Sequence, residues 1–132
     1  MDSSETAPVA GADDDVDEEI LSELLSLMGD GPPDGLAEIF TTFLTGVPAR
    51  LADIDGALRN GRLEEAGRAA HTLRGTAGAF GANRLYRLAG ELEVVCQSSD
   101  AGRAGSLLAE MRTAFATFER ILRARIPPPE GT

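Results

Sequence analysis

Apolar residues recur at three- and four-residue steps along most of this sequence, which is the pattern of amphipathic helices. No stretch alternates apolar and polar residues as a strand would. The pattern predicts helices over about Val16–Met28, Leu36–Leu58 and Leu63–Ala79, a fourth from near Asn83 and a fifth after Asp100. The side chains expected inside are Val16, Ile20, Leu24 and Leu27; Leu36, Phe40, Phe43, Val47, Leu51, Ile54 and Leu58; Leu85, Leu88, Leu92, Val95 and Cys96; and Leu107, Met111, Phe115, Phe118 and Leu122.

Short polar segments separate these predicted helices. "GDGPPDG" (Gly29 to Gly35) ends the first, and Asp34 is suited to cap the second. "NGR" (Asn60 to Arg62) and "SSD" (Ser98 to Asp100) are tight turns, and a tight turn returns the next helix antiparallel. The expected fold is therefore all-α: an antiparallel up-down-up-down four-helix bundle with a short N-terminal capping helix.

Charge is concentrated at one end of the chain. The formal net charge is -10, and residues 1–19 hold eight acids and no base. We expect residues 1–15 to be a disordered acidic tail, 16–126 the helical bundle, and 127–132 a second disordered tail, because its three prolines cannot continue a helix. An acidic protein without a basic stripe is not expected to bind nucleic acid.

Targeting and redox features are few. The N-terminus has no basic flank followed by an apolar stretch, and no apolar run approaches the roughly 18 residues of a membrane span. The single cysteine, Cys96, falls on an apolar helix face and is expected to be a buried reduced thiol. These features favour a cytoplasmic protein, away from membranes. We expect a monomer, because the five predicted helices can bury their own apolar stripes.

The predicted third helix contains the only histidine and a cluster of glycines, in "GRAAHTLRGTAGAFG". Its apolar face comprises Leu63, Ala66, Ala70, Leu73, Ala77 and Phe80. His71 lies roughly 130° from the centre of that face, with Gly67, Arg74, Gly75 and Gly78 on the same side. Three glycines inside a helix cost roughly 3 kcal/mol relative to alanine. One interpretation is that His71 is an ordinary surface histidine and that the glycines are merely tolerated. The other is that the glycines leave a ridge almost without side chains, on which a partner can dock. The energetic cost of the glycines favours the second interpretation.

Few reactions suit a single exposed histidine. Metal binding needs several ligands, and the chain has no second histidine and no cysteine pair. A hydrolytic triad would need a nucleophile and an acid at suitable positions, and neither is evident. What remains is the imidazole as a nucleophile that takes a group from a partner, with Arg74, one turn along, available to a phosphoryl oxygen.

The segment resembles the histidine-containing phosphotransfer (HPt) domain family, whose motif is roughly H-x-L-K-G-S-[SA]-x-x-[LF]-G-A. The matching residues are His71, Leu73, Arg74, Gly75, Thr76, Ala77, Gly78, Phe80, Gly81 and Ala82. The resemblance runs from about Ile20 to Ile126 and includes Pro48, "NGRLEEAGRAAH" and "LAGELE". Arg74 stands where lysine is usual, so a planar guanidinium with several donors replaces a compact ammonium group.

The resemblance implies a phosphocarrier, not an enzyme, in a multistep two-component phosphorelay. His71 would accept phosphoryl from the phospho-aspartate of one response-regulator receiver domain and pass it to another, downstream of a hybrid histidine kinase. Arg74 would face the phosphate, Arg87 is a second candidate contact, and Gly67, Gly75 and Gly78 would admit the receiver. No cofactor is expected to stay bound, and Mg²⁺ would sit in the partner receiver.

Two other interpretations remain open. One is a helical interaction module that binds receivers without carrying phosphate. The presence of His71 within the matching motif favours the phosphocarrier over this module. The other is an excised phosphorylated domain of a chemotaxis-type histidine kinase, whose motif "HSIKGGSGTFG" is similar to "HTLRGTAGAFG".

Overall fold

The computed structural model describes residues 15–27 and 34–125, and helices dominate both ranges. The helices are α2 (Glu18–Ser26), α3 (Asp34–Arg59), α4 (Leu63–Ala79), α5 (Asn83–Gln97) and α6 (Ala101–Arg125). The predicted helix over Leu63–Ala79 and the predicted start at Asn83 are confirmed. No strand occurs within the described ranges. The all-α prediction is confirmed.

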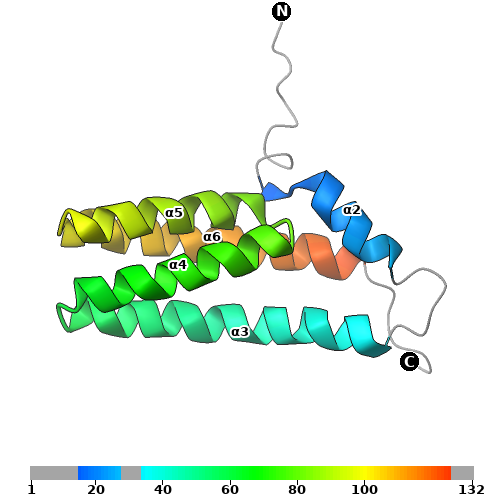
Figure 1. The fold of residues 1–132 in the computed structure, drawn as a ribbon, viewed down its shortest axis with the longest axis horizontal. Coiled ribbons are helices and arrows are strands. Elements are labelled where there is room, and N and C mark those ends of the chain that lie inside the picture. The colour runs from blue at the N-terminus through cyan, green and yellow to red at the C-terminus, as the bar shows by residue number, and fades with distance from the viewer. Residues whose placement is uncertain (1–14, 28–33, 126–132) are drawn as a thin grey trace, which may run out of the picture.

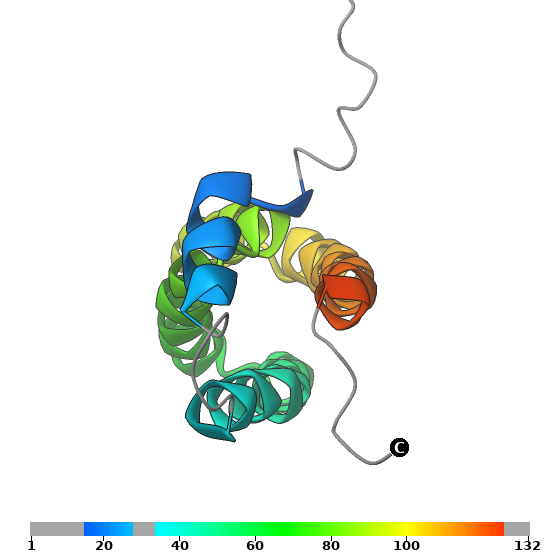
Figure 2. The same cartoon turned by 90° about the vertical axis from the view of Figure 1, so that its right-hand side faces the viewer.

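The four long helices form an antiparallel bundle, as expected. Helix α4 packs between α3 and α5, and α6 closes the bundle by packing against both of these neighbours. Figure 1 shows the bundle from the side, and Figure 2 shows α2 lying across one end of it. This arrangement leaves one flank of α4 facing α3, the other facing α5, and a strip between them exposed.

Each pair of consecutive long helices is joined by a three-residue turn with a left-handed residue in its centre. Gly61 (φ 72°) and Gly81 (φ 78°) take this conformation without a Cβ penalty, and Ser99 (φ 61°) takes it in the last turn. The backbone hydrogen bonds that close the turns run from Arg62 N to Ala57 O (2.8 Å), Ala82 N to Ala77 O (2.9 Å) and Asp100 N to Val95 O (3.4 Å). These six-residue closures satisfy carbonyls at the helix ends and reverse the chain.

The core is apolar, and no buried residue in the described part of the chain is polar or charged. The predicted aromatic stripe is confirmed: Phe43 stacks on Phe80 at 4.4 Å between ring centroids, and its ring meets Phe118 edge-on at 5.6 Å. The five inward residues predicted for the last helix are all buried, Phe118 at 1% and Leu122 at 0% exposure. Aromatic pairs of this geometry stabilise beyond the area that they bury.

The prediction for the first helix is wrong in two respects. The helix begins at Glu18, with the Asp17 side chain accepting a hydrogen bond from Ile20 N, so Val16 lies before it and does not share its periodicity. Leu21 is fully buried, whereas Leu27 is 68% exposed. The physical reason is that α2 crosses the end of the bundle, so only part of its length contacts the core (Figure 2).

Helix α2 is attached to the bundle at two points. Asp17 N donates to Gly81 O (2.8 Å) in the α4–α5 turn. Arg125, at the end of α6, donates to both carboxylate oxygens of Glu18 at 2.6 and 2.7 Å. This bidentate pairing lowers the pKa of Glu18 through its hydrogen bonds to Arg125, and raises the pKa of Arg125.

We expect Glu18→Gln to lower the free energy of unfolding by at most about 1 kcal/mol at neutral pH, because the side chains of Arg125 and Glu18 are 36% and 48% exposed and solvent screens the pair. A lowered carboxylate pKa contributes stability above the unfolded-state pKa, and this contribution disappears as the pH falls through the folded-state value. The difference between the wild type and Glu18→Gln should therefore vanish in acid, below the ordinary glutamate range near 4.5. Urea unfolding between pH 2 and 7 measures it. A difference that persists unchanged at the acid end would contradict the assignment.

Some predictions fall on residues whose structure is not described. These are residues 1–14 of the predicted 1–15 tail, the predicted tail at 127–132, and most of the Gly29–Gly35 segment. Helix α3 begins at Asp34, and the side chains of Asp34 and Leu36 lie outside the description. Among the described helices, none combines the length and the apolar character needed to cross a membrane.

Candidate functional site

Helix α4 presents His71 to solvent from the middle of its length. The apolar face predicted for this helix is confirmed, since Ala66, Ala70, Leu73 and Ala77 are all buried. His71 lies on the flank that faces α5, and its side chain is 61% exposed. The prediction that the imidazole lies outside the core is confirmed.

One ring nitrogen of His71 is engaged by a carboxylate. The distance from His71 Nδ1 to Glu93 Oε2 on α5 is 2.9 Å. A carboxylate can only accept a hydrogen bond, so Nδ1 carries the proton and donates it. The neutral imidazole then has its lone pair on Nε2, which faces away from this contact. The geometry therefore presents one defined nitrogen to an incoming group.

Sequence reasoning did not identify Glu93 as a site residue. It lies 22 positions after His71, on another helix, and its side chain is 24% exposed. Glu93 is the last residue of "LAGELE", the segment already noted on α5. Periodicity alone would place it at the rim of α5, but its contact with His71 depends on the register between the two helices.

That register aligns four positions of α4 with four positions of α5. At each of them a residue on the flank of α4 meets a residue of α5, and the pairs follow in antiparallel order. They are Gly67 with Cys96, His71 with Glu93, Arg74 with Gly90, and Gly78 with Tyr86. We call these eight residues the α4–α5 seam. Glycine stands in three of the four pairs, which lets the helices approach closely along the exposed rim.

The prediction of a bare ridge is wrong for two of its three glycines. A Cβ on Gly67 would lie 3.3 Å from Cys96 Cβ, and one on Gly78 would lie 3.0 Å from Tyr86 Cδ1. Both glycines are covered by α5 side chains, so close helix packing explains them. Gly75 differs, because a Cβ there would meet nothing within 4 Å. Of the three glycines, Gly75 is therefore the one whose missing side chain leaves open space next to His71.

Arg74 lies along α5 instead of extending into solvent. Its Nε is 3.8 Å from Glu93 Oε1, and its guanidinium carbon is 5.9 Å from the centre of the Tyr86 ring. Glu93 thus contacts His71 with one carboxylate oxygen and Arg74 with the other. The structure brings these three side chains together at one point of the seam.

Arg87, the second predicted phosphate contact, lies on the exposed face of α5. It lines a shallow hollow together with Arg74, Tyr86 and Gly90. His71 lines a neighbouring hollow with Glu93, Cys96 and Gly67. The structure therefore places Arg87 on the Arg74 side of the seam and does not bring it to the imidazole.

The remaining chemistry of the seam is limited. Cys96 is 6% exposed, and burial raises the pKa of its thiol, which keeps it protonated and unreactive. This agrees with the expected buried thiol. Within residues 15–27 and 34–125, no group of three or more histidine, cysteine or acidic side chains could hold a metal ion.

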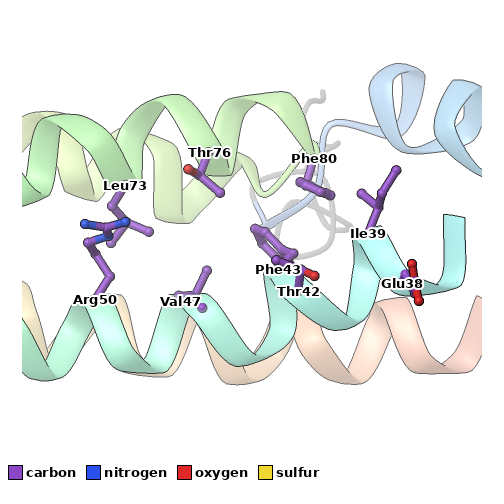
Figure 3. Close-up of a pocket in the computed structure, with 10 residues that line it drawn as sticks. Glu38, Ile39, Thr42, Phe43, Val47, Arg50, Leu73, Thr76 and Phe80 are labelled. Atoms are coloured by element: carbon purple, nitrogen blue, oxygen red, sulfur yellow. The ribbon is translucent and has the colours of Figure 1, made fainter. Parts of the chain in front are cut away.

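A further groove lies on the opposite flank of α4, against α3. Figure 3 shows the rings of Phe43 and Phe80 between the two helices, with Ile39 at one end and Arg50 reaching toward α4 at the other. On α4, the groove is lined by Leu73 and Thr76. His71 and Gly75 do not line it. The groove is thus separate from the seam.

Comparison with known proteins finds the same fold in other proteins. Histidine-containing phosphotransfer protein B from Pseudomonas aeruginosa PAO1 is 27% identical, with a TM-score of 0.73 over 84% of this chain and 94% of that one. The fold also matches histidine-containing phosphotransfer protein MtHPt2 from Medicago truncatula, which is 19% identical, with a TM-score of 0.77 over 89% of this chain and 80% of that one. No curated protein matches the sequence significantly. The Hpt domain model matches residues 38–122, a range that holds His71, Arg74 and Glu93, and the chain therefore belongs to the Hpt domain family.

Proposed function

We propose that this protein is the histidine phosphocarrier of a multistep two-component phosphorelay. His71 accepts phosphoryl from the phospho-aspartate of one receiver domain and passes it to the aspartate of another. The observation that carries the proposal is the pairing of an exposed imidazole with Glu93 at 2.9 Å, in a chain of the Hpt domain family. Both structural neighbours are themselves named histidine-containing phosphotransfer proteins, which supports the same conclusion.

The hydrogen bond from Nδ1 determines how the imidazole reacts. The Nε2 lone pair attacks phosphorus, the bond from phosphorus to the aspartyl oxygen breaks, and the electron pair leaves with the partner's carboxylate. The imidazole ring gains positive charge as the new bond forms. Glu93 carries the compensating negative charge next to Nδ1–H and holds the ring in place, so the proton stays on Nδ1 throughout. The reverse sequence returns the phosphoryl group to a second aspartate.

Access to Nε2 comes from the open surface at Gly75. A receiver's active-site loops surround its aspartate, so the partner's backbone must come close to the imidazole for in-line transfer. Gly75 lies one turn from His71, and the space above it is empty. A side chain at this position would stand between the histidine and the partner.

The partner supplies the rest of the chemistry. We propose that the receiver contributes its own acidic pocket with Mg²⁺ and that this protein binds no cofactor of its own. The upstream donor is the receiver of a hybrid histidine kinase. Arg74 is the one arginine among the eight seam residues, it contacts the same Glu93 carboxylate as the imidazole, and its guanidinium is suited to the phosphoryl oxygens.

Phosphorylation of the purified protein tests the proposal directly. After incubation with a phosphorylated receiver or with phosphoramidate, we expect one phosphoryl group per chain, labile in acid and stable in base, located on His71 by mass spectrometry. Glu93→Gln keeps a hydrogen-bond acceptor but removes the charge, and should slow phosphorylation by roughly tenfold. Receiver binding without any phosphate on His71 would instead support the helical interaction module.

A further inference from the structure

The surroundings of Arg74 are more constrained than those of an ordinary surface arginine. Three α5 residues, Tyr86, Gly90 and Glu93, contact different parts of its side chain. Glu93 Oε1 lies 3.8 Å from Nε, and the Tyr86 ring lies 5.9 Å from the guanidinium carbon. A Cβ on Gly90 would lie only 3.3 Å from Arg74 Cδ. The aliphatic part of the arginine therefore occupies the space that the missing side chain of Gly90 leaves.

Tyr86 is itself held in place by a glycine. Its ring lies against Gly78 on α4, where an added Cβ would be 3.0 Å from Cδ1. Tyr86 is 41% exposed, so it contributes less to the core than a buried aromatic residue. Its ring face is directed instead to a cation, which is attracted to the negative charge of the π system.

We propose that Tyr86 and Gly90 form a slot on α5 that positions Arg74 for the phosphoryl group on His71. This inference rests on the proposed function and names Tyr86 as a positioning residue, not as a catalytic one. The slot restricts the rotamers of a long side chain before the phosphoryl group arrives, so less conformational entropy is lost in the reaction.

The slot also gives a reason for arginine at position 74 where lysine is usual in the motif. Arginine has donors on two sides of one planar group, so Nε can remain at Glu93 while the terminal nitrogens turn to phosphoryl oxygens. Lysine carries its three donors on a single nitrogen, so it reaches Glu93 and the phosphate together only when both lie around that one atom. Arginine can therefore span a wider separation between Glu93 and the phosphate than lysine can.

Phosphorylation by phosphoramidate tests the slot without a docking partner. We expect Tyr86→Leu to reduce the rate of His71 phosphorylation by roughly two- to fivefold, because the cation–π contact is lost. Tyr86→Phe keeps the ring and should retain the wild-type rate. In an Arg74→Gln background, Tyr86→Leu should have no further effect, since the group that it positions is absent.

A second measurement does not depend on phosphorylation. The Nε–Hε NMR resonance of Arg74 should be shifted by the Tyr86 ring current in the wild type and in Tyr86→Phe, and should move toward the free-arginine position in Tyr86→Leu. The slot is overturned if this resonance is the same in Tyr86→Leu as in the wild type, or if Tyr86→Leu slows phosphorylation equally in the Arg74→Gln background. If the wild-type protein takes no phosphate at all, the proposed function fails, and the NMR result alone decides the slot.

Discussion

Substitution of His71 by glutamine should abolish phosphoryl acceptance while leaving the melting temperature nearly unchanged. The side chain is 61% exposed and its hydrogen bond to Glu93 lies at the surface, so its loss should change the free energy of unfolding by less than about 0.5 kcal/mol. Glutamine retains a donor for Glu93 but has no nucleophilic nitrogen. Radiolabelled transfer from a phospho-receiver, with thermal unfolding by circular dichroism, measures both effects.

The outcome separates a functional histidine from a structural one. A large drop in the melting temperature would show that His71 supports the α4–α5 packing and would remove the basis for a docking surface. Phosphate that persists at the wild-type level in His71→Gln would place the acceptor elsewhere. Receiver binding measured on the same variant shows whether docking survives without the imidazole.

Gly75→Gln should affect stability and transfer in opposite directions. The position is helical and open, so glutamine should raise the free energy of unfolding by about 0.6 kcal/mol through helix propensity alone. The new side chain would stand one turn from His71, where the receiver must approach, and transfer should fall by roughly ten- to a hundredfold. Phosphorylation by phosphoramidate should change much less, because a small donor needs no docking surface.

Gly67→Gln is the matched control for this prediction. It makes the same substitution one turn from His71 in the other direction, but its Cβ would lie 3.3 Å from Cys96 Cβ. Overpacking of this kind costs about 1–3 kcal/mol, which exceeds the propensity gain, so the free energy of unfolding should fall. Equal stability changes in the two variants would show that α5 does not cover Gly67. Unchanged transfer in Gly75→Gln would remove the docking role of Gly75.

Helix α2 shows where hydrophobic periodicity stops being informative. Val16 is 2% exposed, as expected for the interior, but it reaches the core from the segment before the helix. Apolar periodicity identifies a buried stripe only where one continuous helix lies along the core. For a helix that crosses the end of a bundle, burial depends on where it meets the other helices, which its own sequence does not encode.

The sequence by itself determined the four long helices, their turns and the outward direction of His71. These properties depend on apolar spacing and turn residues within a few positions, and the buried face of α4 and the left-handed turns at Gly61 and Gly81 agree with them. Only the tertiary structure decided what meets His71 across the seam. Gly67, Gly75 and Gly78 carry the same helix-propensity cost, yet α5 covers the first and last and leaves Gly75 open. Glu93 reaches the imidazole from 22 residues away because the close packing of α4 on α5 sets their register, and that register is a property of two helices together.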